Sequence, residues 1–177
     1  IKNNAPNEPL KFILPNSKPN TKSISFTLSR SAFKRADDNL DLAFTPTASC
    51  KYSIDIPLAR ASSIVVSSKV TIMGYPFDQE GNQSNSINPF QVSGRITQFG
   101  DKDELGYDLS YDAPTKPGYS GGPVLSEDGS ELVAIHGRSD TVKNNQDSEL
   151  REKLRVGGRG ISSANLYKFL KGYGYIL

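Results

Sequence analysis

The sequence predicts an all-β fold closed by one C-terminal α-helix, and three features of the chain carry that prediction. Short segments that alternate polar and apolar residues recur along it, as in residues 23–28. Turn-forming residues separate these segments, as in the Glu-Asp-Gly-Ser run of residues 127–130. Apolar side chains at helical spacing follow near the end, within residues 162–177. Short strands at regular spacing with turns between them are typical of β-barrels.

The composition bounds the class of protein and its partners. With 177 residues, of which 36% are hydrophobic and 23% charged, the chain is long enough to bury the core of one or two small domains. The net charge is only +2 and no apolar run is long enough to span a bilayer, so we expect neither nucleic acid nor a membrane as partner. Cys50 is the only cysteine, which excludes an intrachain disulfide. The cellular compartment is left open.

The first quarter of the chain predicts three short strands. Residues 10–14 form an apolar island between prolines, and residues 23–28 alternate as a half-buried strand does. A charged exposed turn over residues 34–38 leads into a third strand at residues 39–44, where Asp41 stands between two leucines. A carboxylate there is costly to bury unless something holds it. Asp41 is therefore either a strand-end acid facing solvent or a functional carboxylate.

The middle of the chain predicts a crossover and the first strands of a second unit. Residues 45–63 are mixed in composition and interrupted by prolines, whereas residues 69–76 form a strand that ends in a turn. The polar residues 78–88 have no apolar anchor, so we expect a mobile surface loop. Residues 90–99 and 107–111 predict the next two strands.

The last third predicts a hairpin, a final strand and a helix. Residues 123–125 and 132–136 are apolar runs that flank the turn at residues 127–130, a strong hairpin signal. Residues 147–155 are charged with a short helical pattern, and residues 157–161 predict the last strand.

The C-terminal helix has both a start signal and a buried face. Ser162 or Ser163 can accept a hydrogen bond as its N-cap. The apolar residues Leu166, Phe169 and Leu170 recur at the i, i+3 and i+4 spacing of one helix face.

One loop carries the strongest chemical signal in the chain. Residues 117–125 read Pro-Gly-Tyr-Ser-Gly-Gly-Pro-Val-Leu. The glycines allow a tight turn that exposes the Ser120 hydroxyl as a nucleophile. The same turn lets the amides of Gly118 and Ser120 converge as an oxyanion hole. Taken alone, a glycine-rich serine turn can also be ordinary hairpin punctuation.

The full run resembles the nucleophile loop of trypsin-like serine proteases, and most closely that of single-chain bacterial and cyanobacterial members. The Asp-Leu-Ala sequence at Asp41 is similar to the segment that carries the triad aspartate in this family. The resemblance implies a chymotrypsin-like double six-stranded β-barrel with a C-terminal α-helix. It also implies Ser120 as nucleophile and Asp41 as the group that orients the catalytic histidine. No metal or cofactor is implied, because no cluster with ligand spacing is present.

On this resemblance the chain divides into four parts. Residues 1–56 are the remainder of an N-terminal barrel that is incomplete in this chain, and residues 57–66 are the crossover between barrels. Residues 67–161 are expected to form the C-terminal barrel, and residues 162–177 the closing helix.

The histidine of a triad is missing from its expected place. In this family it precedes the aspartate, but His136 is the only histidine and follows Ser120. Two explanations stay open. In the first, the chain is a serine endopeptidase that cleaves proteins or peptides through an acyl-enzyme, and an N-terminal fragment upstream of Ile1 supplies the histidine. In the second, it is an inactive pseudoprotease that binds a protein or peptide.

The residues around the first specificity pocket leave the cleaved bond open. Thr115 and His136 resemble the pair with which glutamyl endopeptidases of this fold hold an acidic side chain, and Arg138 could add positive charge. Asp112 could instead occupy the bottom of the pocket and select Lys or Arg. His136 could also be an ordinary strand residue that is hydrogen-bonded in a barrel wall.

Overall fold

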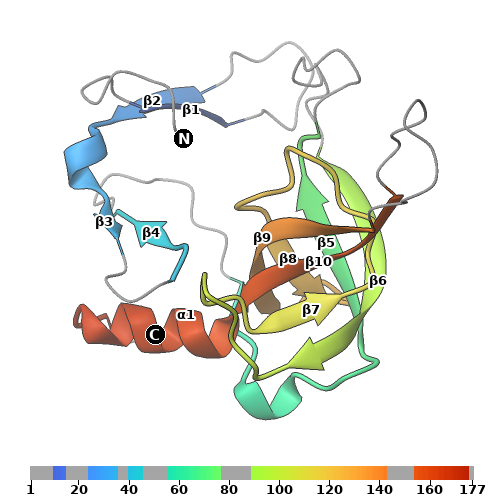
Figure 1. Ribbon diagram of the computed structural model, residues 1–177. Helices are drawn as coiled ribbons and strands as arrows, with labels where there is room; N and C mark the ends of the chain where they lie inside the picture. The colour runs from blue at the N-terminus through green and yellow to red at the C-terminus, as the bar shows by residue number, and fades with distance from the viewer. Residues whose placement is uncertain are drawn as a thin grey trace.

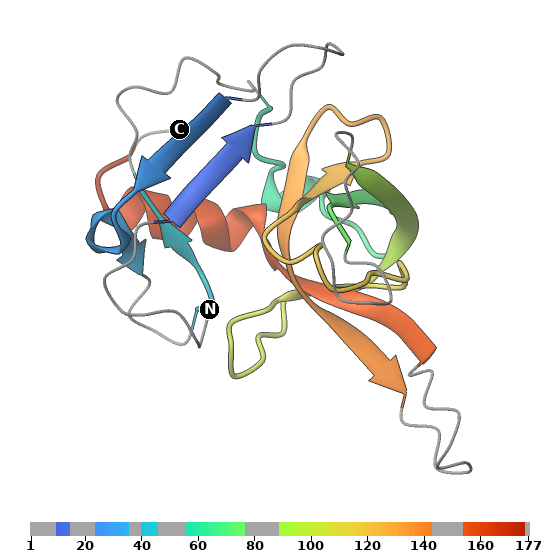
Figure 2. The ribbon, with the colours of Figure 1, turned by 90° about the horizontal axis from the view of Figure 1, so that it is seen from above.

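The chain forms mostly β structure followed by one helix, in the arrangement drawn in Figure 1. The computed structural model describes residues 10–14, 24–35, 40–45, 56–76, 89–142 and 154–175. Strands β1 to β4 lie to one side and a barrel built from β5 to β10 lies to the other, with the helix α1 running beneath β3 and β4 (Figures 1 and 2). This architecture confirms the predicted fold class.

The described residues of the N-terminal part form two small antiparallel sheets. Strand β1 (Leu10–Leu14) pairs with β2 (Ile24–Leu28), and β3 (Lys34–Arg35) pairs with β4 (Ala43–Phe44). Within the described residues these strands do not close into a barrel.

The prediction of a strand over residues 39–44 was wrong in its extent. The strand covers only Ala43–Phe44, and its partner β3 lies where a charged turn was expected. Asp41 lies before the strand because its amide donates to the Leu105 carbonyl (3.0 Å) rather than to a neighbouring strand.

The second unit is a closed six-stranded barrel with the strand order β10-β7-β6-β5-β8-β9. Its strands are β5 (Lys69–Gly74), β6 (Phe90–Phe99), β7 (Leu109–Tyr111), β8 (Pro123–Ser126), β9 (Leu132–Val142) and β10 (Leu154–Ser162). All neighbouring strands are antiparallel. Closure leaves the barrel without an unpaired edge strand.

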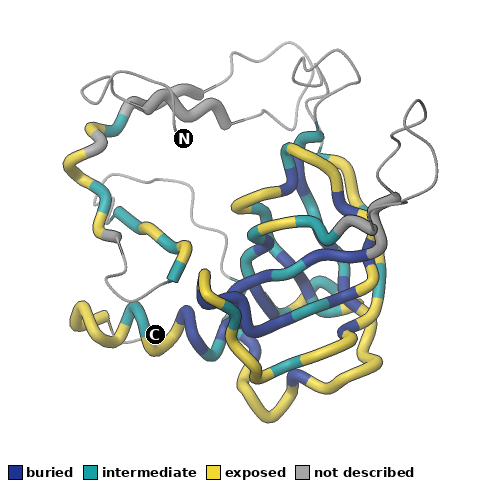
Figure 3. Tube along the Cα trace, in the orientation of Figure 1, coloured by how far each residue is buried: buried dark blue, intermediate teal, exposed yellow. Residues whose placement is uncertain are grey.

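The hydrophobic core lies inside this barrel, as the dark blue segments of Figure 3 show. In β5, Val70 and Ile72 are buried while Thr71 between them is partly exposed, as the alternation of a strand with one inward face requires. The core also includes Ile96, Leu109, Tyr111, Val124, Val133 and Ala134. The core thus contains side chains from each of the barrel strands β5 to β9.

Helix α1 (Ser163–Gly172) begins at a buried capping group. Ser162 is its N-cap and accepts a hydrogen bond from the Asn165 amide (3.3 Å), which confirms one of the two predicted caps. The Asp108 carboxylate accepts from both the Ser162 amide (2.8 Å) and the Ser162 hydroxyl (2.6 Å). Because all three groups are buried, β10 and the helix start are fixed to the end of the loop before β7.

The other end of α1 packs on the N-terminal part through an aromatic cluster. The Phe44 ring makes edge-to-face contacts with Phe169, Tyr173 and Tyr175, with ring centroids 5.1–5.4 Å apart. Such pairs are favourable beyond the apolar area they bury. The cluster holds β4, and with it the segment that carries Asp41, against the helix.

Three features named from the sequence fall mostly outside the described residues. These are the predicted mobile loop at residues 78–88, Cys50, and the helical pattern at residues 147–155, whose last two residues begin β10. No helix in the part of the chain that the structure describes is long and apolar enough to cross a bilayer.

The Asp108 cap predicts a large loss of stability when it is removed. Asp108→Ala leaves the buried Ser162 amide and hydroxyl without an acceptor, so we expect it to lower the free energy of unfolding by about 3 kcal/mol. Denaturant unfolding measures this, with Asp101→Ala as control because Asp101 is exposed and bonds only the Gln98 side chain. Equal stability of the two variants would contradict the proposed anchor.

Candidate active site

Ser120 lies on a turn between β7 and β8 that only glycines permit. Gly118 and Gly121 have φ values of 100° and 83°, in the left-handed region that other residues rarely adopt. A Cβ atom on Gly118 would also lie 2.1 Å from the Tyr75 carbonyl oxygen. The neighbouring Tyr119 side chain is buried against Gly74, so the turn is anchored on both sides of Ser120's exposed side chain.

Two amides of this turn make no hydrogen bond to another described residue. The Gly121 amide donates to the His136 carbonyl and the Gly122 amide to the Tyr119 carbonyl, both at 2.8 Å. Among the described residues, neither the Gly118 amide nor the Ser120 amide has an acceptor. A pair of free amides beside a hydroxyl is what stabilisation of an oxyanion requires.

The Ser120 hydroxyl is held by the neighbouring strand. It is exposed and donates a hydrogen bond to the Gly137 carbonyl in β9 (2.8 Å). No described group acts as a base toward it, because its one hydrogen bond is to a carbonyl that cannot take up the proton.

Asp41 is held to the second barrel by two hydrogen bonds. Its amide donates to the Leu105 carbonyl (3.0 Å), and its Oδ2 accepts from the Tyr107 hydroxyl (2.5 Å). The Tyr107 ring lies against Gly137, where a Cβ atom would come within 2.1 Å of the ring. Asp41 and Ser120 are thus connected through Tyr107 and the Gly137 backbone.

His136 is placed inside the barrel wall and away from the Ser120 hydroxyl. Its side chain is 1% exposed, and Nδ1 forms a hydrogen bond with the Tyr111 hydroxyl. Burial lowers the pKa of His136 from 6.5 to about 4, so the ring is neutral at pH 7. This geometry gives His136 no contact with Ser120 through which it could act as its base.

The structure brings Thr115 and His136 together. A Cβ atom on Gly158 would lie 3.0 Å from His136 Cε1 and 3.1 Å from Thr115 Oγ1, so both side chains flank the same glycine of β10. Thr115 is fully buried, and its hydroxyl pairs with that of Ser139 (2.8 Å).

Arg138 and Asp112, the other two expected pocket residues, lie apart from this pair. The Arg138 guanidinium sits over the Tyr107 ring (5.6 Å to the centroid) and 3.1 Å from Asp103 Oδ2. Asp112 is exposed, and its Oδ1 accepts from the Arg95 amide (2.5 Å). Its carboxylate is therefore engaged with β6.

A family model for the trypsin-like peptidase domain matches residues 16–135, a span that includes Asp41 and Ser120. The chain belongs to the trypsin-like peptidase family. The family is named for peptidases, which are hydrolases.

Solved structures similar to this trypsin-like chain include two of Rv3671c from M. tuberculosis. One is the inactive form of a serine-to-alanine mutant, with 17% identity, a TM-score of 0.45, and coverage of 67% of this chain and 53% of that chain. The other is the active form of the protease, with 17% identity, a TM-score of 0.44, and coverage of 69% and 49%. The chain therefore spans about half the length of these two structures. No curated protein sequence matches it.

The HtrA-type protease AlgW, solved with a decapeptide, is also similar. Its identity is 17% and its TM-score 0.44, with 68% of this chain and 34% of that chain covered.

Sequence reasoning missed several residues of this candidate site. Tyr107 contacts Asp41 across 66 positions, and Tyr111 contacts His136 across 25, so neither pair leaves a local pattern. The paired glycines at residues 157–158 were a usable signal, since a glycine inside a strand often marks a close approach of other groups.

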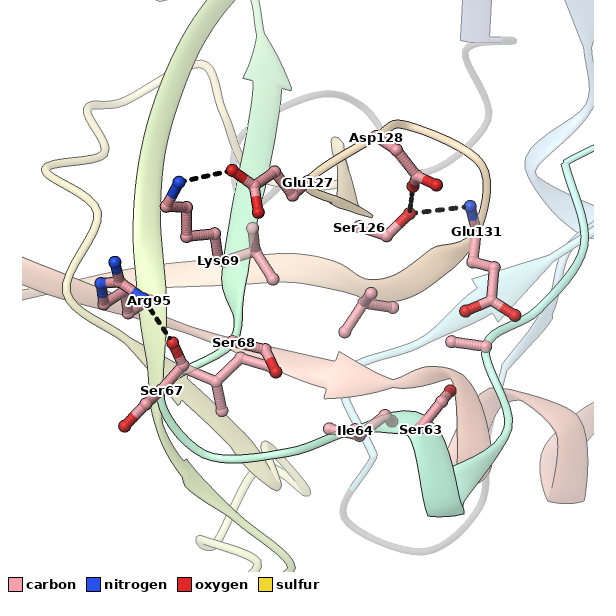
Figure 4. Close-up of a pocket in the computed structure, with 14 residues that line it drawn as sticks. Ser63, Ile64, Ser67, Ser68, Lys69, Arg95, Ser126, Glu127, Asp128 and Glu131 are labelled. Carbon is pink, nitrogen blue, oxygen red and sulfur yellow. Dashed lines mark hydrogen bonds and ion pairs between the residues drawn. The ribbon is translucent and has the colours of Figure 1, made fainter.

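A cavity of about 600 Å³ opens at the other end of the barrel, with Lys69 and Glu127 at its rim. Lys69 begins β5 there, whereas Gly74 at the far end of β5 packs on Tyr119. Figure 4 shows hydrogen bonds among the residues that line this cavity, including Lys69 with Glu127 (2.5 Å) and Arg95 with the Ser67 carbonyl (2.7 Å). The cavity is separate from the Ser120 loop. Among the described residues, no three His, Cys, Asp or Glu side chains cluster as metal ligands.

The buried state of His136 predicts a pH-dependent stability. The unfolded chain binds a proton at this histidine near pH 6.5 and the folded chain near pH 4. Stability is therefore fully present above pH 6.5 and falls as the pH is lowered toward 4. The loss amounts to roughly 3 kcal/mol.

Denaturant unfolding at pH 7 and pH 4.5 tests this in the native protein and in His136→Gln. The carboxylates titrate in the same way in both proteins, so their effect on stability cancels in the comparison. Between pH 7 and pH 4.5 the native protein should therefore lose more free energy of unfolding than the variant. Equal losses would show that His136 is not held neutral by burial.

Proposed function

We propose that this protein is a serine endopeptidase in which Ser120 forms an acyl-enzyme with the substrate. The observation that carries the proposal is the exposed Ser120 hydroxyl beside the two free amides of Gly118 and Ser120. Attack by the hydroxyl on a peptide carbonyl forms a tetrahedral intermediate whose oxyanion these amides would bind, a contribution of about 3–4 kcal/mol per donor in a comparable site. The amine then leaves with a proton, and water hydrolyses the ester.

The general base is a histidine that a segment upstream of Ile1 supplies. A serine hydroxyl needs a neighbouring base to become nucleophilic, and His136 is buried and bonded to Tyr111. Asp41 is exposed with one oxygen bonded to Tyr107. Its other oxygen can accept from the imidazole of the incoming histidine and fix the tautomer.

Replacing Ser120 tests the proposal against the binding-module alternative. In the full-length protein, Ser120→Ala should abolish peptide and protein hydrolysis while substrate binding changes little, because only the nucleophile is removed. Ser130→Ala in the exposed β8–β9 turn is the matched control and should keep full activity. A full-length native protein that binds peptides but never cleaves them would support the pseudoprotease instead.

The placement of the pocket residues favours an acidic residue before the scissile bond. Thr115 and His136 lie together beside Gly158. In the free protein their polar groups pair with Ser139 and Tyr111, and binding of an acidic side chain would redirect the hydroxyl and the imidazole to donate to its carboxylate. The Asp112 carboxylate, which would have selected Lys or Arg, bonds the Arg95 amide.

Two variants separate the acidic and basic preferences. We expect kcat/KM to be higher for a peptide with Glu before the scissile bond than for the matched Lys peptide. Thr115→Val should lower the ratio of kcat/KM for the Glu peptide to kcat/KM for the Lys peptide by about tenfold, because one donor to the carboxylate is lost. Asp112→Asn should leave the ratio unchanged. If instead the Lys peptide is preferred and Asp112→Asn removes that preference, the basic alternative is correct.

A further inference from the structure

We propose that Tyr107 is the positioning residue for Asp41, and that its hydroxyl holds the carboxylate in the orientation in which it receives the catalytic histidine. The inference rests on the proposed function, because it assigns a task to the same site. It adds a residue that lies outside the Ser120 loop and the Asp41 motif.

The contact itself is short and comes from a fixed side chain. The Tyr107 hydroxyl donates to Asp41 Oδ2 at 2.5 Å, and Tyr107 is only 4% exposed. Burial first, and then the hydrogen bond to Asp41, raises the pKa of Tyr107 well above its ordinary value. The Tyr107 hydroxyl therefore stays protonated at neutral pH and remains a hydrogen-bond donor. Hydrogen bonds from a neutral donor to a carboxylate are among the stronger ones in proteins.

The loop that carries Tyr107 holds Asp41 at a second point. The Asp41 amide donates to the Leu105 carbonyl two residues before Tyr107. The loop is itself a tight turn, because Asp103 Oδ1 accepts from the amides of both Leu105 and Tyr107 (3.0 Å each). Gly106, at φ 79°, supplies the left-handed position that the turn needs. Backbone and side chain of Asp41 are thus fixed by one rigid element of the second barrel.

The ring of Tyr107 reaches the Ser120 side of the site. It occupies the space above Gly137, where a Cβ atom would lie 2.1–2.7 Å from three of its atoms. The carbonyl of Gly137 accepts from the Ser120 hydroxyl. Tyr107 therefore contacts both Asp41 and the glycine whose carbonyl holds the Ser120 hydroxyl, and the missing side chain at position 137 makes room for it.

Charged groups around the ring support this placement. The Arg138 guanidinium lies over the ring face, and Asp103 Oδ2 lies 3.1 Å from Arg138 and 3.6 Å from Arg159. The acids and bases that face Tyr107 are thus Asp41, Asp103, Arg138 and, through Asp103, Arg159. Both arginines lie beside the Asp103 carboxylate, and Arg159 also pairs with Asp140 (3.1 Å).

A double-mutant cycle in the full-length protein distinguishes a Tyr107 that positions Asp41 from a Tyr107 that only stabilises the fold. The variants are Tyr107→Phe, Asp41→Asn and both together, with Tyr167→Phe on the exposed face of α1 as the matched control. Tyr107→Phe should lower kcat by about tenfold with KM changed less than about twofold, because one hydrogen bond to the carboxylate is lost. In the Asp41→Asn variant, adding Tyr107→Phe should lower kcat very little further, because Tyr107 acts through Asp41. Tyr167→Phe should match the native protein.

Each other outcome overturns the inference in a recognisable way. If Ser120→Ala abolishes hydrolysis but Tyr107→Phe keeps kcat, the inference fails and the proposed function stands. If Tyr107→Phe and Asp41→Asn have independent, additive effects on kcat, the phenol is a structural contact only. If the folded native protein shows no Ser120-dependent hydrolysis, the proposed function fails and this inference fails with it.

Discussion

The main-chain pairing between the Ser120 loop and strand β9 is the interaction on which the site depends. The Gly121 amide donates to the His136 carbonyl (2.8 Å), the His136 amide donates to the Gly122 carbonyl (2.9 Å), and the Ser120 hydroxyl donates to the Gly137 carbonyl (2.8 Å). Because these bonds use β9 carbonyls and amides, they hold the loop whatever side chains β9 carries. The turn that carries the Ser120 hydroxyl and the Gly118 and Ser120 amides is therefore fixed to β9.

The same strand separates two polar clusters with different tasks. On the buried side, His136 and Thr115 pair with Tyr111 and Ser139, so polar groups inside the barrel satisfy one another at little cost. At the surface, Arg138 covers the ring that bonds Asp41. Closure of the barrel positions both clusters at once, because β10 pairs with β9 on one side and with β7 on the other.

The sequence predicted the parts of this arrangement that have local causes. Alternation located the strands, the Glu-Asp-Gly-Ser turn located the β8–β9 hairpin, and Ser162 was one of two expected helix caps. The tight glycine turn at Ser120 could be predicted because it has a local sequence signature. The strand through Asp41 was predicted too long, because its pairing with Leu105 depends on a loop far along the chain. For the same reason no pattern near Asp41 indicated Tyr107.

The most direct test of the central claim is to treat the native full-length protein with a fluorophosphonate probe and to locate the adduct by mass spectrometry. An activated serine beside an oxyanion hole reacts with such probes, whereas an ordinary serine does not. The account predicts a single adduct on Ser120, in a preparation that also contains a histidine-bearing segment from upstream of Ile1. Absence of any adduct at probe concentrations that label an ordinary serine protease would contradict it.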